Sequence, residues 1–264
     1  MSAAADLPPV LAVRASVAPL TDPVFISDLH LAPERPRTLA RFLRFLREDA
    51  TAHPELVILG DLFEFWIGDD AGAAAAPVID ALASVARSGQ RVLVMHGNRD
   101  PLLGTEFARV TGATLIADPI VVDLAGTPTL LAHGDAWCTL DADYQRFRAL
   151  ARQPGFQREF LAKPVEERIA FARGARLQSE HEKSLKAMDI MDVTPDAVIA
   201  ALRAANVGRV IHGHTHRPAA HVLEVDGRRA ERWVLPDWDL DDSEPRGGFL
   251  DYAGGRPRLV FFDD

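Results

Sequence analysis

Five short apolar runs, each followed by a polar side chain, constrain what this chain can fold into. They are PVFIS before Asp28, ELVILG before Asp61, RVLVMHG before Asn98, PTLLA before His133 and RVIHG before His214. The runs are rich in β-branched residues and lack alternating polar positions, which is typical of strands buried on both faces of a sheet. The sequence therefore predicts buried strands whose ends carry side chains of the types that bind metal ions.

Helix signals stand between the runs. TLARFLRFLRED carries leucine and phenylalanine at helical spacing, and PVIDALASVARSG starts with proline and stops before glycine. Thr194, followed by Pro195, indicates a further helix with threonine as its N-cap. The C-terminal stretch GGFLDYAGGRPRLVFF is typical of a glycine-turned hairpin. Strand, helix, strand is therefore the predicted repeat, and the fold class is α/β.

The intervals between the polar residues are nearly constant at first. Asp61 follows Asp28 after 33 residues, Asn98 follows after a further 37, and His133 after a further 35. Each interval is about the length of one βαβ unit. The next interval, from His133 to His214, is 81 residues long. We therefore expect an insertion of about 46 residues between these two histidines.

The inserted segment is visible in the composition of residues 141–190. It is rich in helix formers and carries ten basic against eight acidic residues, in a chain whose net charge is −9. We expect a helical lid over the strand ends, where open α/β sheets bind their ligands. The predicted division is an N-terminal extension at 1–20, a core formed by 21–140 and 191–264, and the lid at 141–190.

Composition excludes several classes of partner and location. The chain is 48% hydrophobic, enough for one large core, and 38 acidic against 29 basic residues argue against general nucleic-acid binding. Cys138 is the only cysteine, so neither a disulfide within the chain nor a thiolate zinc cluster can form. The N-terminal MSAAADLPPVLAVRASVAPL resembles neither a secretory signal nor a membrane span. We expect a cytoplasmic protein.

The polar residues at the strand ends form a set of metal ligands without thiolate. The set comprises Asp28, His30, Asp61, Asn98, His133, His214 and His216. Its oxygen and nitrogen donors suit Mn²⁺, Fe²⁺ or Zn²⁺ better than a calcium cage. The set is too large for one catalytic ion with an open position, and it suits two ions about 3.5–4 Å apart that share a carboxylate. Two divalent ions would leave this site positively charged and would provide an activated hydroxide as nucleophile. The ligand set therefore predicts a phosphate diester or a diphosphate as the substrate.

The order of the motifs resembles a known superfamily. FISDLHL, ILGDLFEFWIGDD, HGNRD, AHGD and IHGHTHRP are similar to the calcineurin-like metallophosphoesterases, and the WIGDD and GNRD forms resemble the UDP-2,3-diacylglucosamine diphosphatases of lipid A biosynthesis. The resemblance implies a four-layer α/β/β/α sandwich with an inserted helical lid. It also implies a pair of Mn²⁺ ions. One would be held by Asp28, His30, Asp61 and His216, and the other by Asp61, Asn98, His133 and His214, with Asp61 as the bridge.

The resemblance further implies a substrate and the residues that bind it. The family splits UDP-2,3-diacylglucosamine into UMP and 2,3-diacylglucosamine 1-phosphate. Positions that match its substrate contacts are Asn98, Arg99, Asp141, Ser179, Lys186 and His214. Lys183 stands where the family has asparagine, and we expect its ammonium group to meet a phosphate. The amphiphilic substrate implies a cytoplasmic protein that contacts the inner membrane peripherally, and we favour a monomer.

Arg99 indicates which bond breaks. Many members of the wider superfamily have histidine after the GN pair, where it can protonate an alkoxide, whereas arginine keeps its proton near neutral pH. A leaving phosphate monoester, whose second pKa is about 6, needs no such acid. A guanidinium group instead stabilises charge on the diphosphate oxygens. We therefore expect hydroxide to attack the phosphorus next to uridine, with Arg99 as the charge-stabilising residue.

Two other functions fit the same motifs. A nucleotide or dinucleoside polyphosphate hydrolase would need no cavity of acyl length, so a long apolar cavity under the lid would argue against it. A metallophosphoesterase fold kept only as a binding module typically has a broken ligand set. Here the set is complete, which favours an enzyme.

Other residues near the motifs have structural interpretations. His53, His96 and His212 are three of the histidines outside the ligand set. We expect hydrogen bonds in the core, and not a metal ion, to hold them. The aromatic run Phe63, Phe65, Trp66 and Ile67 either lines an acyl channel or packs a helix onto the sheet. Asp69 and Asp70 either support the ligands or cap a turn.

Overall fold

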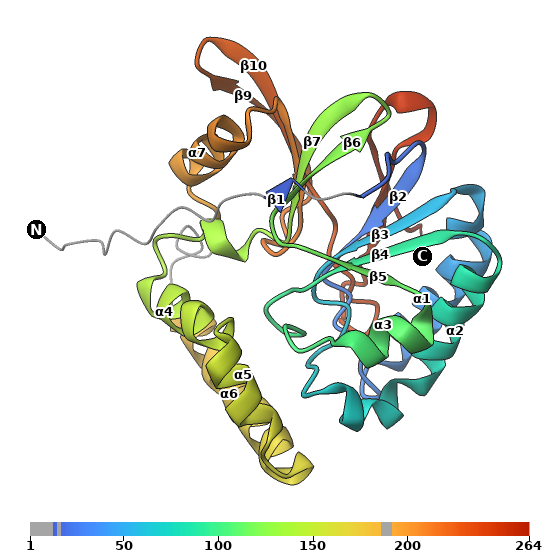
Figure 1. Cartoon of the computed structure of the whole chain (residues 1–264), viewed down its shortest axis with the longest axis vertical. Helices are drawn as coiled ribbons and strands as arrows, with labels where there is room; N and C mark the ends of the chain where they lie inside the picture. The colour runs from blue at the N-terminus through green and yellow to red at the C-terminus, as the bar shows by residue number, and fades with distance from the viewer. Residues whose placement is uncertain (1–12, 15–16, 186–191, 264) are drawn as a thin grey trace, which may run out of the picture.

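Two six-stranded sheets lie face to face at the centre of the molecule (Figure 1). The computed structural model describes residues 13–14, 17–185 and 192–263. The strands of the first sheet are β2 (Pro23–Ile26), β3 (Glu55–Leu59), β4 (Arg91–Met95), β5 (Thr114–Ile116), β11 (Gly248–Asp251) and β12 (Arg258–Phe261). Those of the second are β1 (Val13–Arg14), β6 (Ile120–Leu124), β7 (Thr127–Ala132), β8 (Arg209–His212), β9 (Ala219–Val225) and β10 (Arg228–Val234). The strand orders are β12-β11-β2-β3-β4-β5 and β1-β6-β7-β8-β10-β9.

Helices cover the outer face of each sheet. Those on the first sheet are α1 (Pro36–Glu48), α2 (Ala76–Arg87) and α3 (Thr105–Thr111), and the one on the second is α7 (Pro195–Ala205). Within β2, Val24 and Ile26 pack under the helices, while Phe25 between them packs in the core between the sheets. Burial on both faces explains the lack of polar alternation in the runs. The fold is an α/β/β/α sandwich, which confirms the predicted fold class.

Helix α1 shows which features of the sequence produce the helices of this outer layer. Pro36 opens the helix, where a missing amide proton costs nothing. Phe42 and Phe45 follow on the face that meets the sheet, and both are fully buried. Their rings meet Trp238 edge-on, with centroids 6.3 and 5.5 Å away. Burial of each phenylalanine contributes roughly 1.5–3 kcal/mol, so packing on the sheet stabilises this helix more than its own propensity does.

The remaining predicted elements are present, with one difference in detail. α7 begins at Pro195, and Thr194 before it has the extended backbone of an N-cap. The Thr194 side chain, however, makes no capping hydrogen bond, because its hydroxyl lies 2.8 Å from that of Thr139. β11 and β12 pair antiparallel on either side of the turn at Ala253–Gly255, which confirms the C-terminal hairpin.

One predicted βαβ unit is wrong. All five apolar runs are strands, but between Asn98 and His133 the chain forms α3, β5 and β6. β7 then pairs antiparallel with β6 in the second sheet. Ala125 and Gly126, both with positive φ, join the two strands in a turn that matches the twist of a hairpin. A short helix and two short strands occupy the length of one crossover, so spacing alone could not distinguish them.

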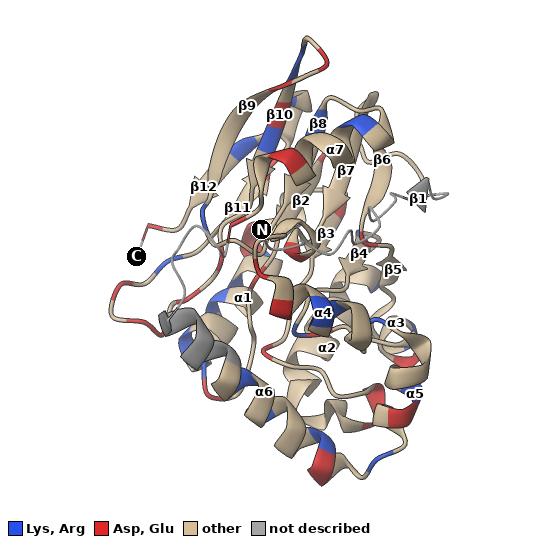
Figure 2. Ribbon diagram, turned by 90° about the vertical axis from the view of Figure 1, so that its left-hand side faces the viewer, with Lys and Arg blue, Asp and Glu red and all other residues tan. Residues whose placement is uncertain are grey.

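Residues 141–190 form three helices over their described part. They are α4 (Ala142–Ala151), α5 (Pro154–Leu161) and α6 (Val165–Leu185), and Figure 1 shows them extending together from the sandwich. Acidic and basic residues are intermixed along them (Figure 2). Arg168 of α6 is almost fully buried and donates to the Ile67 carbonyl and the Asp70 carboxylate. Among the described helices none is long and apolar enough to cross a bilayer.

Candidate metal and substrate site

The carboxyl ends of strands from both sheets bring the predicted ligands together. One group comprises Asp28, Asp61, His133 and His214, whose ligand atoms all lie within 4.8 Å of one another. A second group comprises Asp28, His30 and His216. Asn98 joins the first group, because its Oδ1 lies 3.0 Å from Nε2 of His133. Oδ2 of Asp61 lies 3.7 Å from Nε2 of His133 and 3.9 Å from Nδ1 of His30, between the two groups.

The backbone under this cluster is strained. Its members with positive φ, between 49° and 67°, are Asp28, His30, Asp61, His214 and His216. A left-handed conformation costs a residue other than glycine on the order of 1–3 kcal/mol, so the surrounding contacts must hold it in place. The amides of Leu29 and His30 both donate to the Asp61 carbonyl, and the His214 amide donates to Oδ2 of Asp28. Hydrogen bonds between the strained turns therefore stabilise them and direct their side chains toward a common point.

Two glycines in the motifs are required by close approach between these loops. A β-carbon at Gly97 would lie 2.0 Å from Oδ1 of Asp61, and one at Gly213 would lie 2.2 Å from Oδ2 of Asp28. Any other residue at either position would displace a carboxylate of the cluster. The glycine of each pair, Gly97 before Asn98 and Gly213 before His214, therefore allows the ligand loops to pack closely, and the second residue of each pair is a predicted ligand.

The cluster fits divalent metal ions. Oδ1 of Asp28 and Nδ1 of His30 are buried and have no hydrogen-bond partner among the described residues. Buried polar atoms of this kind are costly unless something binds them. Nε2 of His30 and Nε2 of His216 face each other at 3.5 Å, although two histidines gain little from such a contact unless a shared proton or a cation lies there. Carboxylate, amide and imidazole donors without thiolate are the set that first-row divalent ions prefer.

The ionisable groups of the cluster shift one another strongly. Burial raises the pKa of Asp28, but its close contact with His216, 3.6 Å from Oδ1 to Nε2, and the charge of His133 outweigh burial and hold the pKa well below its ordinary value. Burial lowers the pKa of His216, but its close contacts with the carboxylates of Asp237 and Asp28 raise it to about 9. Burial raises the pKa of Asp61 to about 7. Opposing shifts at such short range are typical of functional sites.

Hydrogen bonds behind the cluster fix the orientation of two histidines. Nδ1 of His133 lies 2.9 Å from the Leu59 carbonyl, and Nδ1 of His216 lies 3.2 Å from Oδ2 of Asp237. Each contact leaves Nε2 directed at the cluster, as in metal sites where an outer carboxylate or carbonyl sets the tautomer. Asp237 is almost fully buried, and the sequence analysis missed it because it stands outside the recognised motifs.

His53, His96 and His212 have backbone partners instead. His212 is fully buried, and its Nδ1 lies 2.8 Å from the Gly213 carbonyl. His96 and His53 lie 2.7 and 3.0 Å from the carbonyls of Leu103 and Asp22. None of the three belongs to the metal-ligand groups of the described residues. The prediction that core hydrogen bonds hold these histidines is confirmed.

Two aspartates of the motifs hold the loops of the site. Asp100 is fully buried and accepts from the amides of Gly97 and Leu62, which ties the loop after β4 to the loop after β3. Asp69 accepts from Nε1 of Trp66 and from the amides of Glu106 and Phe107 at the start of α3. Asp69 therefore caps a helix from outside it. No sequence-based prediction gave a role to Asp100, and the role of Asp69 stood open between two alternatives.

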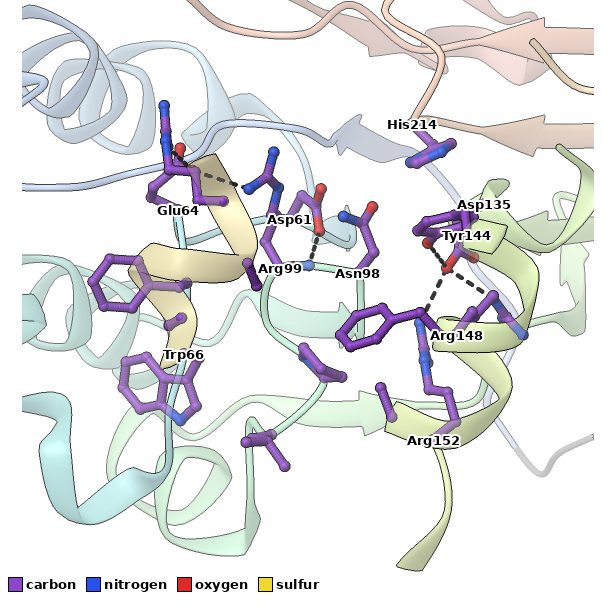
Figure 3. Close-up of a pocket in the computed structure, with 18 of the residues that line it drawn as sticks. Asp61, Glu64, Trp66, Asn98, Arg99, Asp135, Tyr144, Arg148, Arg152 and His214 are labelled. Carbon is purple, nitrogen blue, oxygen red and sulfur yellow. Dashed lines mark hydrogen bonds and ion pairs between the residues drawn. The ribbon is translucent and has the colours of Figure 1, made fainter. Parts of the chain in front are cut away.

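Helix α4 holds the ligand loops from the other side. Oδ2 of the buried Asp135 accepts from the Tyr144 hydroxyl and from Nε of Arg148, each at 2.8 Å. Nη2 of Arg148 also donates to Asp118, whose other oxygen accepts from the His133 amide. Figure 3 shows Tyr144, Arg148 and Asp135 converging beside His214. Because Asp135 follows His133 by two residues, α4 is fastened directly to a ligand loop.

A cavity of about 500 Å³ joins the cluster to an aromatic region of the insertion. From the cluster it is lined by His30, Asp61, Asn98, His214 and His216, of which Figure 3 labels Asp61, Asn98 and His214. It is also lined by Phe65, Phe147, Phe156, Phe160 and Phe171. Phe63 packs in the core against Trp66, whereas Phe65, Trp66 and Ile67 line the cavity. The aromatic run therefore packs in the core at Phe63 and lines the cavity at its other members, while the acyl channel stays a prediction.

The predicted substrate residues fall into two sets. Asn98, Arg99, Asp141 and His214 all line the cavity. Oδ1 of Asp141 also accepts from the Tyr144 amide and so caps α4. Ser179 and Lys183 lie in α6, but their side chains are outside the described part of the structure, and Lys186 is outside the described residues altogether. The first set therefore lies where a ligand of the cavity could reach it, and the substrate contacts of both sets stay predictions.

Comparisons with known proteins agree along most of the chain. Residues 23–218 match the family model described as Calcineurin-like phosphoesterase. A protein of Bordetella pertussis named UDP-2,3-diacylglucosamine hydrolase is 49% identical over 228 residues, which cover 85% of this chain and 88% of that protein. Proteins of the same name from Marinobacter nauticus and Pseudomonas paraeruginosa are each 50% identical over 217 residues, which cover 82% of this chain and 89% and 90% of theirs.

Proposed function

The chain belongs to the calcineurin-like phosphoesterase family, and from this premise we propose that it hydrolyses UDP-2,3-diacylglucosamine to UMP and 2,3-diacylglucosamine 1-phosphate. The relatives of similar length carry the name of that activity. The observation that carries the proposal is the cavity, which is lined both by the polar cluster and by aromatic side chains. A sugar diphosphate with acyl chains has the same two parts. The reaction belongs to lipid A biosynthesis.

Two Mn²⁺ ions would occupy the cluster in this proposal. Asp28, His30, Asp61 and His216 would hold one, and Asp61, Asn98, His133 and His214 the other. The position of Asp61 between the two groups supports its role as the shared carboxylate. When bound, such ions supply Lewis acidity at the phosphoryl oxygens and a nucleophile at neutral pH. One chain provides the whole ligand set, in keeping with a monomer.

Side chains of the protein position the diphosphate for attack at the phosphorus next to uridine. The Arg99 amide donates to Oδ1 of Asp61 at 2.8 Å, which fixes this loop against the cluster. The Arg99 guanidinium stabilises the charge that accumulates on the diphosphate oxygens, and the lipid-bearing phosphate leaves without an acid. Asn98 and His214 contact the substrate from the core, and Asp141 does so from the start of the insertion. Ser179, Lys183 and Lys186 complete the contacts from the insertion.

The acyl chains would lie against the aromatic side chains that line the cavity. Burial contributes about 0.8 kcal/mol per CH₂, so the diacyl substrate should exceed its deacylated analogue by several orders of magnitude in kcat/KM. Turnover of both compounds, with UDP-N-acetylglucosamine as a third, tests this directly. Comparable rates would point to a nucleotide hydrolase instead. Chelation by EDTA should abolish turnover and Mn²⁺ should restore it, whereas full activity of a demonstrably metal-free protein would refute the two-ion site.

We also propose that the insertion contacts the inner membrane peripherally. Large exposed apolar side chains on or beside it are Leu140, Phe147, Leu150, Leu161, Phe171 and Leu177. Leu177→Glu should weaken flotation with anionic vesicles, since its side chain is 67% exposed. Val222→Glu in β9 is a matched control, because Val222 is 65% exposed but lies outside the insertion. If wild-type protein does not float with vesicles at all, this placement fails.

A further inference from the structure

The carboxylate of Glu64 lies among cationic groups at the edge of the metal cluster. Glu64 stands in the loop after β3, and its side chain is only 10% exposed. Its Oε1 lies 3.4 Å from Nη1 of Arg99 and also contacts Nη1 of Arg176 in α6. Its Oε2 lies 4.0 Å from Nδ1 of His30. Figure 3 shows the Arg99 side chain extending to Glu64 and away from Asp61.

This contact bridges two parts of the protein that the chain keeps far apart. Arg99 comes from the loop after β4, while Arg176 comes from the insertion. A buried carboxylate without cationic partners would cost several kcal/mol, so Glu64 draws both guanidinium groups toward it. Glu64 thereby orients the charge-stabilising arginine and holds α6 against the core.

Both arginines also line the cavity together with Asp61 and Asn98. A guanidinium group binds carboxylate and phosphate oxygens with the same planar set of donors. A diphosphate that reaches the cluster therefore meets donors that Glu64 already engages. The carboxylate and the phosphate compete for the same two side chains.

We propose that Glu64 is a positioning residue that holds Arg99 and Arg176 before the substrate binds and exchanges them for phosphate oxygens afterwards. The identity of that anion rests on the proposed function. The contact with Glu64 keeps both guanidinium groups oriented in the free enzyme. After the reaction, the Glu64 carboxylate competes with the phosphate product for the same two groups. Glu64 therefore lowers the affinity of the site for phosphate and keeps α6 closed on the core in the free enzyme.

Two variants with opposite expected effects on anion binding test the exchange. Each protein is loaded with Mn²⁺, and its affinity for inorganic phosphate is measured by calorimetry. Glu64→Gln removes the competing charge, so phosphate should bind about tenfold more tightly. Arg176→Gln removes a donor, so phosphate should bind about tenfold more weakly. Glu167→Gln is the control. Glu167 is exposed and lies in α6, as Arg176 does, and its substitution makes the same charge change as Glu64→Gln. This variant should leave the affinity for phosphate unchanged.

Hydrogen exchange in residues 165–178 provides the second measurement. Both Glu64→Gln and Arg176→Gln should speed exchange there in the absence of phosphate, because either change breaks the contact that holds α6. The proposal is overturned if Glu64→Gln binds phosphate no more tightly than wild type. It is also overturned if Arg176→Gln leaves hydrogen exchange in α6 unchanged. This second test remains available even if the Glu64→Gln protein does not fold. Neither measurement uses the UDP-lipid, so failure to turn over that substrate would be a separate result.

Discussion

The ring of Tyr144 stacks on the imidazole of His214, with ring centroids 6.0 Å apart and 27° between the planes. Tyr144 belongs to α4 of the insertion, whereas His214 belongs to the loop after β8 of the core. The Tyr144 hydroxyl donates to Asp135, two residues beyond His133. One side chain of the insertion thus touches one predicted ligand and braces the loop of another.

Tyr144→Phe should separate these two roles. The variant keeps the stacked ring but removes one hydrogen bond to the buried Asp135, so we expect a loss of about 1 kcal/mol in the free energy of unfolding and little change in Mn²⁺ affinity. Tyr144→Leu also removes the stack, and Mn²⁺ affinity should fall by about 10-fold or more. Calorimetric Mn²⁺ titration and thermal unfolding of both variants provide the measurements. Equal Mn²⁺ affinities in the two variants would show that the stack does not orient His214.

The histidines of the IHGHTHRP motif should differ sharply in their effects. His214→Ala or His216→Ala removes a predicted ligand, so turnover should fall by orders of magnitude and bound Mn²⁺ should decrease. His212→Ala removes a fully buried ring that packs edge-on against Trp137, so it should mainly lower the melting temperature. Metal content, kcat and thermal unfolding distinguish the two cases. An equal loss of kcat in folded His212→Ala would contradict our assignment.

Arg99→His tests the charge-stabilising role of the guanidinium group. Histidine provides a proton donor but lacks the planar fork, so diphosphate hydrolysis should fall by ~10²-fold or more. Wild-type hydrolysis in ¹⁸O-water should place the label in UMP, because we expect attack at the uridine-side phosphorus. Label in the sugar phosphate would show attack at the other phosphorus, and an Arg99→His rate equal to wild type would exclude the role of Arg99.

The thiol of Cys138 should be unreactive in the folded protein. Burial, together with the negative charges of Asp135 and Asp192, raises the pKa of this thiol to about 12. The thiolate is the reactive form, so iodoacetamide should label the native protein at pH 8 roughly a thousandfold more slowly than the denatured chain. The raised pKa contributes stability that is complete below about pH 9 and lost as the pH rises toward 12. Mass spectrometry measures both labelling rates, and rapid labelling of the native protein would show that the thiol is accessible.

The sequence by itself determined the strands and the chemistry of their ends. A strand buried on both faces must be apolar throughout, so the sequence showed β2, β3, β4, β7 and β8 as apolar runs. The residue types that follow these runs indicated a metal-binding set. The glycines beside Asn98 and His214 were equally visible. These features are local, because each depends on a residue and its immediate neighbours along the chain.

The tertiary structure decided what no local pattern records. The regular interval from Asn98 to His133 concealed a change of sheet, because similar lengths of chain build a crossover or a hairpin. The left-handed backbone of the ligand residues arises from contacts between loops that are distant in sequence. Asp237 behind His216, and Arg176 beside Glu64, meet their partners only after the chain has folded. Buried charges need partners of opposite sign wherever the fold supplies them, and sequence separation sets no limit on that supply.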